Sequence, residues 1–193
     1  MKIDLNSYKE FLIAQKMLAL GNKYLVTDIS NNVLLYSKQK LFKLKEDFRF
    51  YYDQGEKEEA LVIRAENIID FSGKYDVIDP INGSTIGKIK REGLSSLVRG
   101  KWKVISPSDE EIAEVSEDST LLAILRRFFD VISYFIPVEF TIRKGETVLG
   151  SIKKKRALIR DRYYLDMRQD SSSQIDRRLT IALAILLDSI NNQ

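Results

Sequence analysis

The sequence predicts a mainly β fold of the α+β class: a closed antiparallel barrel of about 12 strands around a central hydrophobic C-terminal helix. Three observations lead to this prediction. Strand-and-turn units recur at spacings of about 24 to 27 residues, the strand count exceeds what an open sheet usually carries, and the last helical segment is apolar on every face. The whole chain, residues 1–193, is expected to form a single domain.

Each repeated unit begins with an aromatic residue that opens a short alternating strand, which runs through a turn into a second apolar strand. The four aromatic residues are Tyr24, Phe48, Tyr75 and Trp102. A period of this size indicates one supersecondary unit copied along the chain. We interpret the aromatics as wall residues of corresponding strands. Stacking on nucleic-acid bases is the alternative for such a row, and nucleic acid is not an expected partner.

Strands that follow one another through short turns predict antiparallel pairing. The expected strands cover residues 11–20, 23–29, 33–37, 48–50, 60–64, 75–79, 85–90, 102–106, 112–115, 138–143, 147–154, 157–160 and 163–168. Two of them contain the similar stretches IGKIK and LGSIK, with Gly87 and Gly150 inside the strand. Glycine in a strand indicates a bulge or a sharp bend, as at a barrel corner.

Two segments are expected to be helical. The first, at about 119–133, is amphipathic, with Arg126, Arg127 and Asp130 on a narrow polar stripe. It is expected to be buried against the sheet, or else to offer an apolar patch to a dimer partner or a membrane surface.

The second helix is expected near the C-terminus, where Ser173 and Asp176 fit a capping box and residues 179–187 are apolar except for Thr180. Helical residues step about 100°, so these positions cover the whole circumference, and a helix that is apolar all round is buried all round. Nine such residues span roughly 14 Å, against the roughly 30 Å of a bilayer core. The interior of the barrel is therefore the expected place for this helix, and no transmembrane segment is expected.

Composition excludes several kinds of chemistry. The chain has no Cys and no His, which removes disulfides, thiolate ligands, the usual general base and the commonest metal ligand. An enzyme would have to use Asp, Glu, Lys, Tyr or Ser alone. We therefore expect no enzymatic activity, no cofactor and no metal. Lys and Arg exceed Asp and Glu by only 3, so any attraction of anions must come from local clusters.

Several stretches match a known family in order and spacing. They are residues 11–16 (FLIAQK), 20–23 (LGNK), 71–77 (FSGKYDV), 86–89 (IGKI), 94–97 (LSSL), 101–104 (KWKV) and 181–188 (IALAILLD). Together they resemble the LURP-one-related proteins, which belong with phospholipid scramblases and the tubby C-terminal domain. The resemblance implies a closed β-barrel around a C-terminal hydrophobic helix and a non-enzymatic binding module.

The same resemblance has limits for function. Scramblases act on membrane lipids in response to calcium, whereas tubby domains bind phosphoinositides. The segment before the last helix carries Asp161, Asp166 and Asp170, which do not form the alternating ligands of a calcium loop. A palmitoylated Cys-rich stretch is absent as well. The chain therefore departs from the scramblase pattern.

The best candidate for a ligand site is a set of basic residues on the two similar strands and at the start of the terminal helix. These candidate phosphate-binding residues are Lys88, Lys90, Arg91, Lys153, Lys154, Lys155, Arg156, Arg177 and Arg178. If the two strands lie near each other, the charges form one surface, worth about 1 kcal/mol per residue beside an anionic leaflet. The alternative is a solvated strand end that prevents aggregation.

The expected partner is thus an anionic membrane lipid or another phosphorylated ligand. A structural or oligomeric module that forms a homo-oligomer through residues 119–133 is the alternative. The acidic stretch at 108–118 fits no cation-binding loop and is interpreted as a solvated turn and helix start. Because the first ten residues lack an apolar run behind a basic start, a cytoplasmic location is expected, with peripheral membrane contact for the lipid-binding case.

Overall fold

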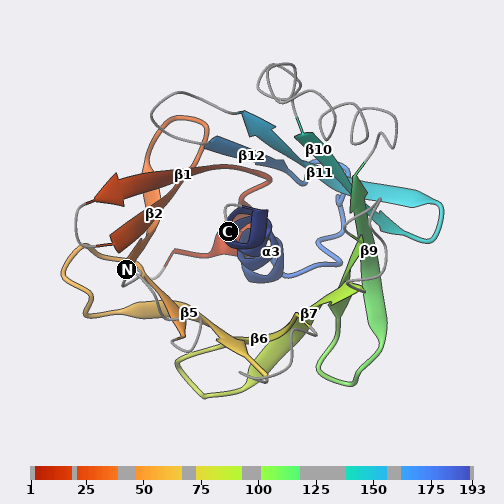
Figure 1. Cartoon of the computed structure of the whole chain (residues 1–193), viewed down its shortest axis with the longest axis horizontal. Coiled ribbons are helices and arrows are strands. Elements are labelled where there is room, and N and C mark those ends of the chain that lie inside the picture. The colour runs from red at the N-terminus through yellow and green to blue at the C-terminus, as the bar shows by residue number, and fades with distance from the viewer. Residues whose placement is uncertain are drawn as a thin grey trace.

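Twelve antiparallel strands close into one barrel, and the helix α3 lies at its centre (Figure 1). The computed structural model describes residues 3–18, 21–38, 47–66, 73–92, 101–117, 138–155 and 162–191. The predicted barrel and its central helix are confirmed. The helix expected at 119–133 and the strand expected at 157–160 lie outside the described residues.

The strands follow the chain in order around the wall. They are β1 (Glu10–Leu18), β2 (Gly21–Thr27), β3 (Val33–Lys38), β4 (Phe48–Tyr51), β5 (Glu59–Ala65), β6 (Lys74–Ile78), β7 (Thr85–Glu92), β8 (Lys101–Ile105), β9 (Glu111–Glu117), β10 (Val138–Lys144), β11 (Thr147–Lys155) and β12 (Arg162–Asp166). Each strand pairs with the next, and β12 returns to β1, for example through Ile13 opposite Tyr163. A 3-10 turn, η1 (Leu5–Ser7), precedes β1.

The inner face of the wall is apolar because side chains alternate along each strand. On β8, for instance, Trp102 and Val104 are buried, whereas their neighbours Lys101 and Lys103 are partly exposed. The four repeated aromatics behave in the same way. Phe48, Tyr24 and Trp102 are buried and Tyr75 is partly buried, so the interpretation of these residues as parts of the wall is confirmed.

The two glycines predicted to mark bulges lie beside register shifts. Gly87 faces Val77 at the shift between β6 and β7, and Gly150 faces Ile142 at the shift between β10 and β11. Gly87 also gives room to the central helix, because a Cβ on it would lie 2.7 Å from the carbonyl oxygen of Ile105 and 3.1 Å from the methyl groups of Leu179. The wall and the helix therefore fit closely at this point.

Helix α3 (Arg177–Asn191) fills the barrel as predicted. Leu179 and all residues from 181 to 187 are at most 1% exposed, and each large apolar side chain buried in this way stabilises the fold by about 1.5–3 kcal/mol. Thr180, the polar exception, donates its hydroxyl to the carbonyl of Arg177 at 2.9 Å. The polar group is satisfied within the helix itself.

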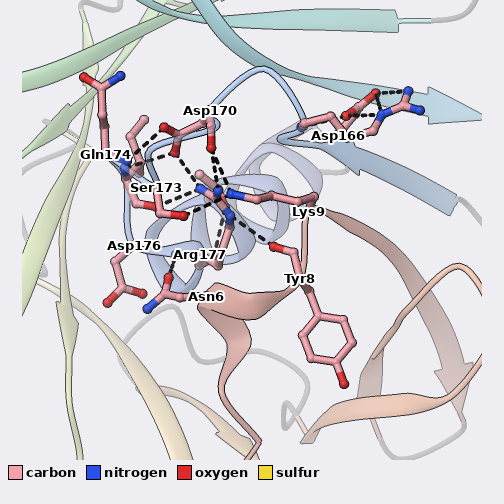
Figure 2. A network of polar contacts seen from close by, with 12 residues as sticks. Asn6, Tyr8, Lys9, Asp166, Asp170, Ser173, Gln174, Asp176 and Arg177 are labelled. Atoms are coloured by element: carbon pink, nitrogen blue, oxygen red, sulfur yellow. Dashed lines mark hydrogen bonds and ion pairs between the residues drawn. The ribbon is translucent and has the colours of Figure 1, made fainter.

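The helix begins one turn later than the predicted capping box. Asp176 is the cap, since its carboxylate accepts the backbone N–H of Arg178 at 2.9 Å. Ser173 instead adopts a left-handed conformation with φ 52° in the loop, where its hydroxyl accepts a bond from Lys9 Nζ at 3.0 Å. The loop and the start of β1 are thus tied together at this end of α3 (Figure 2).

Candidate functional site

The five described hairpin turns lie at the end of the barrel where α3 begins, because alternate connections of an antiparallel meander return to the same end. They cover residues 28–32, 52–58, 79–84, 106–110 and 145–146, and each carries a net negative charge. Arg178 of α3 reaches one of them, with Nη1 2.9 Å from Asp79 Oδ2. We call this the acidic end.

The opposite end, where α3 finishes, is the basic end. Its described cations include Arg49, Arg64, Lys74, Lys90, Arg91, Lys101, Lys103, Lys153, Lys154 and Arg162, all close to strand termini. Fewer described carboxylates lie at the same end, namely Asp47, Glu66, Glu92, Glu114, Glu117, Glu139 and Asp188. The two ends of the barrel therefore differ in the sign of their charge.

Ion pairs on the outer face neutralise part of the basic end. The nitrogen-to-oxygen distances are 2.8 Å for Lys74–Glu66, 3.1 Å for Lys101–Glu114, 2.6 Å for Lys103–Glu92 and 3.0 Å for Lys153–Glu139. Exposed pairs of this kind contribute about 0–1 kcal/mol each to stability. Glu111 and Glu114 belong to the acidic stretch at 108–118. Both lie on β9, where a strand was predicted at 112–115, and they act as counterions of β8 lysines, a role that was not predicted.

The candidate residues on β7 have three different surroundings. Lys88 Nζ lies 2.6 Å from Asp109 Oδ1, and this bond raises the pKa of Lys88. Lys90 is exposed and makes no ion pair within the described part of the chain. Arg91 is partly buried, with its guanidinium carbon 6.0 Å from the ring centre of Trp102, a cation–π distance. Of the three, Lys90 offers its charge most directly to solvent.

The candidate residues on β11 are split between the two faces of the wall. Lys153 is exposed, whereas Lys154 is 4% exposed and points into the barrel, with Nζ 3.5 Å from Asp188 Oδ1. Lys155 ends the strand opposite Arg162. Arg156 lies outside the described residues. Lys154 is thus committed to an internal ion pair.

The two candidate arginines of α3 lie at the acidic end. Arg177 is fully buried, and its Nη1 is 2.7 Å from Asp170 Oδ2. Burial raises the pKa of Asp170, but the Arg177 guanidinium and the N–H groups of Gln174 and Ile175 outweigh it, so that the pKa lies below its usual 3.8. Figure 2 shows Arg177 at the centre of this network. It fastens the helix and is not available to a ligand.

The two similar strands do not lie near each other, so the condition under which their charges would form one surface is not met. β8, β9 and β10 separate β7 from β11 around the wall, because the meander keeps strands in sequence order. Lys90 and Lys153 therefore share one end of the barrel but not one side of it. Phosphate binding by the candidate residues stays a prediction.

A buried polar cluster surrounds the last turns of α3. Asp188 accepts hydrogen bonds from the hydroxyls of Tyr24 at 2.8 Å and Tyr163 at 2.7 Å, and Lys154 Nζ lies 5.2 Å from the Tyr163 ring centre. The hydroxyl of Ser37, cross-strand neighbour of Tyr24, is buried and has no hydrogen-bond partner within the described residues. The interior therefore holds a polar cluster near the basic end in addition to the buried Arg177–Asp170 pair at the acidic end.

Sequence reasoning missed Asp188 as an internal partner and did not include Arg162 in the site. Arg162 is the first residue of β12 and is exposed. Successive side chains of a strand point to opposite faces, so the apolar neighbour Tyr163, which faces inward, could have indicated that Arg162 faces outward. The only signal for Asp188 was a carboxylate directly after an entirely apolar helical run.

Two further findings concern the described residues alone. They contain no group of three carboxylates placed to hold a metal ion. Among them, no helix has both the length and the apolar character needed to cross a bilayer. What the basic end offers chemically is a set of ammonium and guanidinium groups, which bind anions.

Comparisons with known proteins agree with the fold. A family model described as LURP-one-related matches residues 33–188. A crystal structure of an Arabidopsis thaliana protein is similar with a TM-score of 0.53 and 12% sequence identity, covering 99% of each chain. At this identity the likeness concerns the fold alone. The comparison with curated protein sequences gives no significant match.

Proposed function

The chain belongs to the LURP-one-related family, and from its charge distribution we propose that it is a non-enzymatic module that binds a phosphate-bearing anion at the basic end of the barrel. The ligand class covers anionic lipid headgroups and soluble phosphorylated molecules, which share the same recognition chemistry. Lys90, Lys153 and Arg162 are the residues we assign to this contact because all three are exposed.

The separation of charge between the two ends carries this proposal. A chain with a net charge of only +3 has little overall attraction for anions, but here the negative charge of five turns is collected at the other end. Beyond about 8 Å at physiological ionic strength the acidic turns are screened. An anion that approaches the basic end therefore meets a field more positive than the net charge suggests.

Vesicle flotation tests the lipid form of the proposal. We expect binding to phosphatidylcholine vesicles that contain phosphatidylserine or a phosphoinositide, no binding to phosphatidylcholine alone, and weaker binding as salt is raised. Calorimetry with inositol hexakisphosphate tests the soluble form. Equal binding to neutral and anionic vesicles, together with no heat from the soluble polyphosphate, would refute the proposal.

A further inference from the structure

Exposed cations occur on widely separated strands of the basic end. Lys90 lies two residues before the end of β7, Lys153 two residues before the end of β11, and Arg162 is the first residue of β12. Four steps around the wall lead from β7 to β11. At about 4.8 Å per strand this is about 19 Å along the wall.

This separation limits how a flat anionic surface can contact the barrel. Four of twelve steps around a closed wall turn the outward direction by roughly 120°. A bilayer that touches the side of the barrel at Lys90 therefore cannot also touch it at Lys153 or Arg162. A bilayer across the basic end can contact all three residues at once.

The acidic end adds a second argument. The helix between the two ends has 15 residues and is about 22 Å long. When the barrel stands on its basic end, the five acidic turns are thus more than two Debye lengths of about 8 Å from the surface. In a side-on position, acidic turns and basic strand ends would both lie at the surface and oppose each other.

We propose that the barrel docks end-on onto an anionic lipid bilayer, with the last turns of α3 toward the membrane and the five acidic turns toward the solution. This inference rests on the proposed function and adds the face and the orientation of contact. The occupant of the basic end is then a bilayer surface, whose many headgroups can meet separated cations simultaneously. A single small phosphorylated molecule could engage one of these positions at a time.

Charge-removing variants test whether both sides of the basic end take part. The variants are Lys90→Ser, the pair Lys153→Ser with Arg162→Ser, and all three together, measured on vesicles of phosphatidylcholine with phosphatidylserine. Each cation near such a surface is worth about 1 kcal/mol, or about fivefold in affinity, so the triple variant should bind roughly 100-fold more weakly. If only one of the two sets affects binding, the barrel lies on its side and the inference is wrong.

A matched control separates position from net charge. The control variant combines Glu58→Lys, Glu110→Lys and Glu146→Lys, which are exposed positions in three of the acidic turns. Together they alter the net charge twice as much as the triple serine variant does. End-on docking keeps these positions far from the surface, so we expect affinity at physiological salt to change less than about twofold. A large gain in affinity would show that net charge, and not orientation, governs binding.

Because the chain has no Cys, single labelled cysteines can report orientation directly. The labelled variants are Ser116→Cys and Ser108→Cys. Ser116 lies near the basic end of β9, and Ser108 lies in the turn that precedes the same strand. A polarity-sensitive dye should change its emission on anionic vesicles at position 116 and stay unchanged at position 108. The opposite pattern, or equal changes at both, contradicts the orientation. No binding to anionic vesicles contradicts docking altogether, and the proposed function itself fails only if inositol hexakisphosphate also gives no heat.

Discussion

Two buried ion pairs hold the two ends of the central helix. Arg177 pairs with Asp170 where α3 begins, and Asp188 pairs with Lys154 near its end. Buried pairs often add little net stability, because the cost of removing charges from water offsets their attraction. Apolar contacts between helix and wall are non-directional, however, and select an axial position less strictly than paired charges do. We interpret the pairs as the contacts that fix the position of the helix along the barrel.

The Lys154–Asp188 pair gives a direct prediction. Lys154→Met removes the cation and leaves a buried carboxylate, so we expect a loss of about 3–5 kcal/mol in the free energy of unfolding, measured in urea. Adding Asp188→Asn should restore much of that loss, because no charge is then left buried and the amide oxygen can still accept from the tyrosine hydroxyls. Lys153→Met, next in the chain but exposed, should cost less than about 0.5 kcal/mol. Additive losses in the double variant would show that the two residues are not coupled.

Asp170 gives a prediction about acid stability. Its pKa is lowered in the folded protein, so its contribution is present above the usual pKa of 3.8 and is lost as pH falls through the lower folded value. Asp170→Asn should therefore reduce stability at neutral pH and flatten its decline below about pH 4. Urea midpoints across this range measure both effects. Glu110→Gln, at an exposed carboxylate of a turn, is the comparison, and an equal effect there would contradict the special role of Asp170.

At the scale of the elements, the sequence was sufficient to predict structure that depends on a local pattern. It was insufficient where a side chain bonds to a residue far away in the chain. The alternation of β8 and the apolar circumference of α3 are local patterns, and both were predicted correctly. The start of α3 was predicted one turn too early because Ser173 fits a cap by spacing alone. Its actual bond is to Lys9, 164 residues away in the chain, which no local pattern reveals.

The central helix can be tested by a single substitution. Leu183 is fully buried, so Leu183→Asp should place a carboxylate among apolar side chains and cost several kcal/mol, a large share of typical domain stability. We expect an insoluble or unfolded product by circular dichroism. Leu183→Met, which keeps volume and polarity, should cost less than about 1.5 kcal/mol. A normally melting Leu183→Asp protein would contradict the position of α3 inside the barrel.

At the scale of the molecule, charge was harder to predict than apolar burial. Alternation alone puts Lys154 on the same face as Ile152, which faces the interior. A buried lysine is acceptable only with a partner, and Asp188 is 34 positions further along the chain. The run of basic residues at 153–156 was therefore predicted as one surface cluster, although the wall places Lys154 inside and Lys153 outside.

Cooperative unfolding tests the expectation of one domain. The single tryptophan, Trp102, is buried in β8, whereas circular dichroism reports on the whole barrel. If the chain is one folding unit, both signals should give the same urea midpoint and the same slope. A tryptophan transition that precedes or follows the loss of secondary structure would indicate independently folding parts.

The place of α3 in the chain has a consequence for biosynthesis. The helix follows all twelve strands, and the pairing that closes the wall joins β1 to β12. A ribosome therefore releases the inward faces of the strands before it releases the side chains that cover them. The nascent chain must carry exposed apolar strands until residues 179–187 emerge, and such intermediates are prone to aggregate. Closure of this barrel is thus a late event in synthesis, and the interval before it is when we expect the nascent chain to be most prone to aggregate.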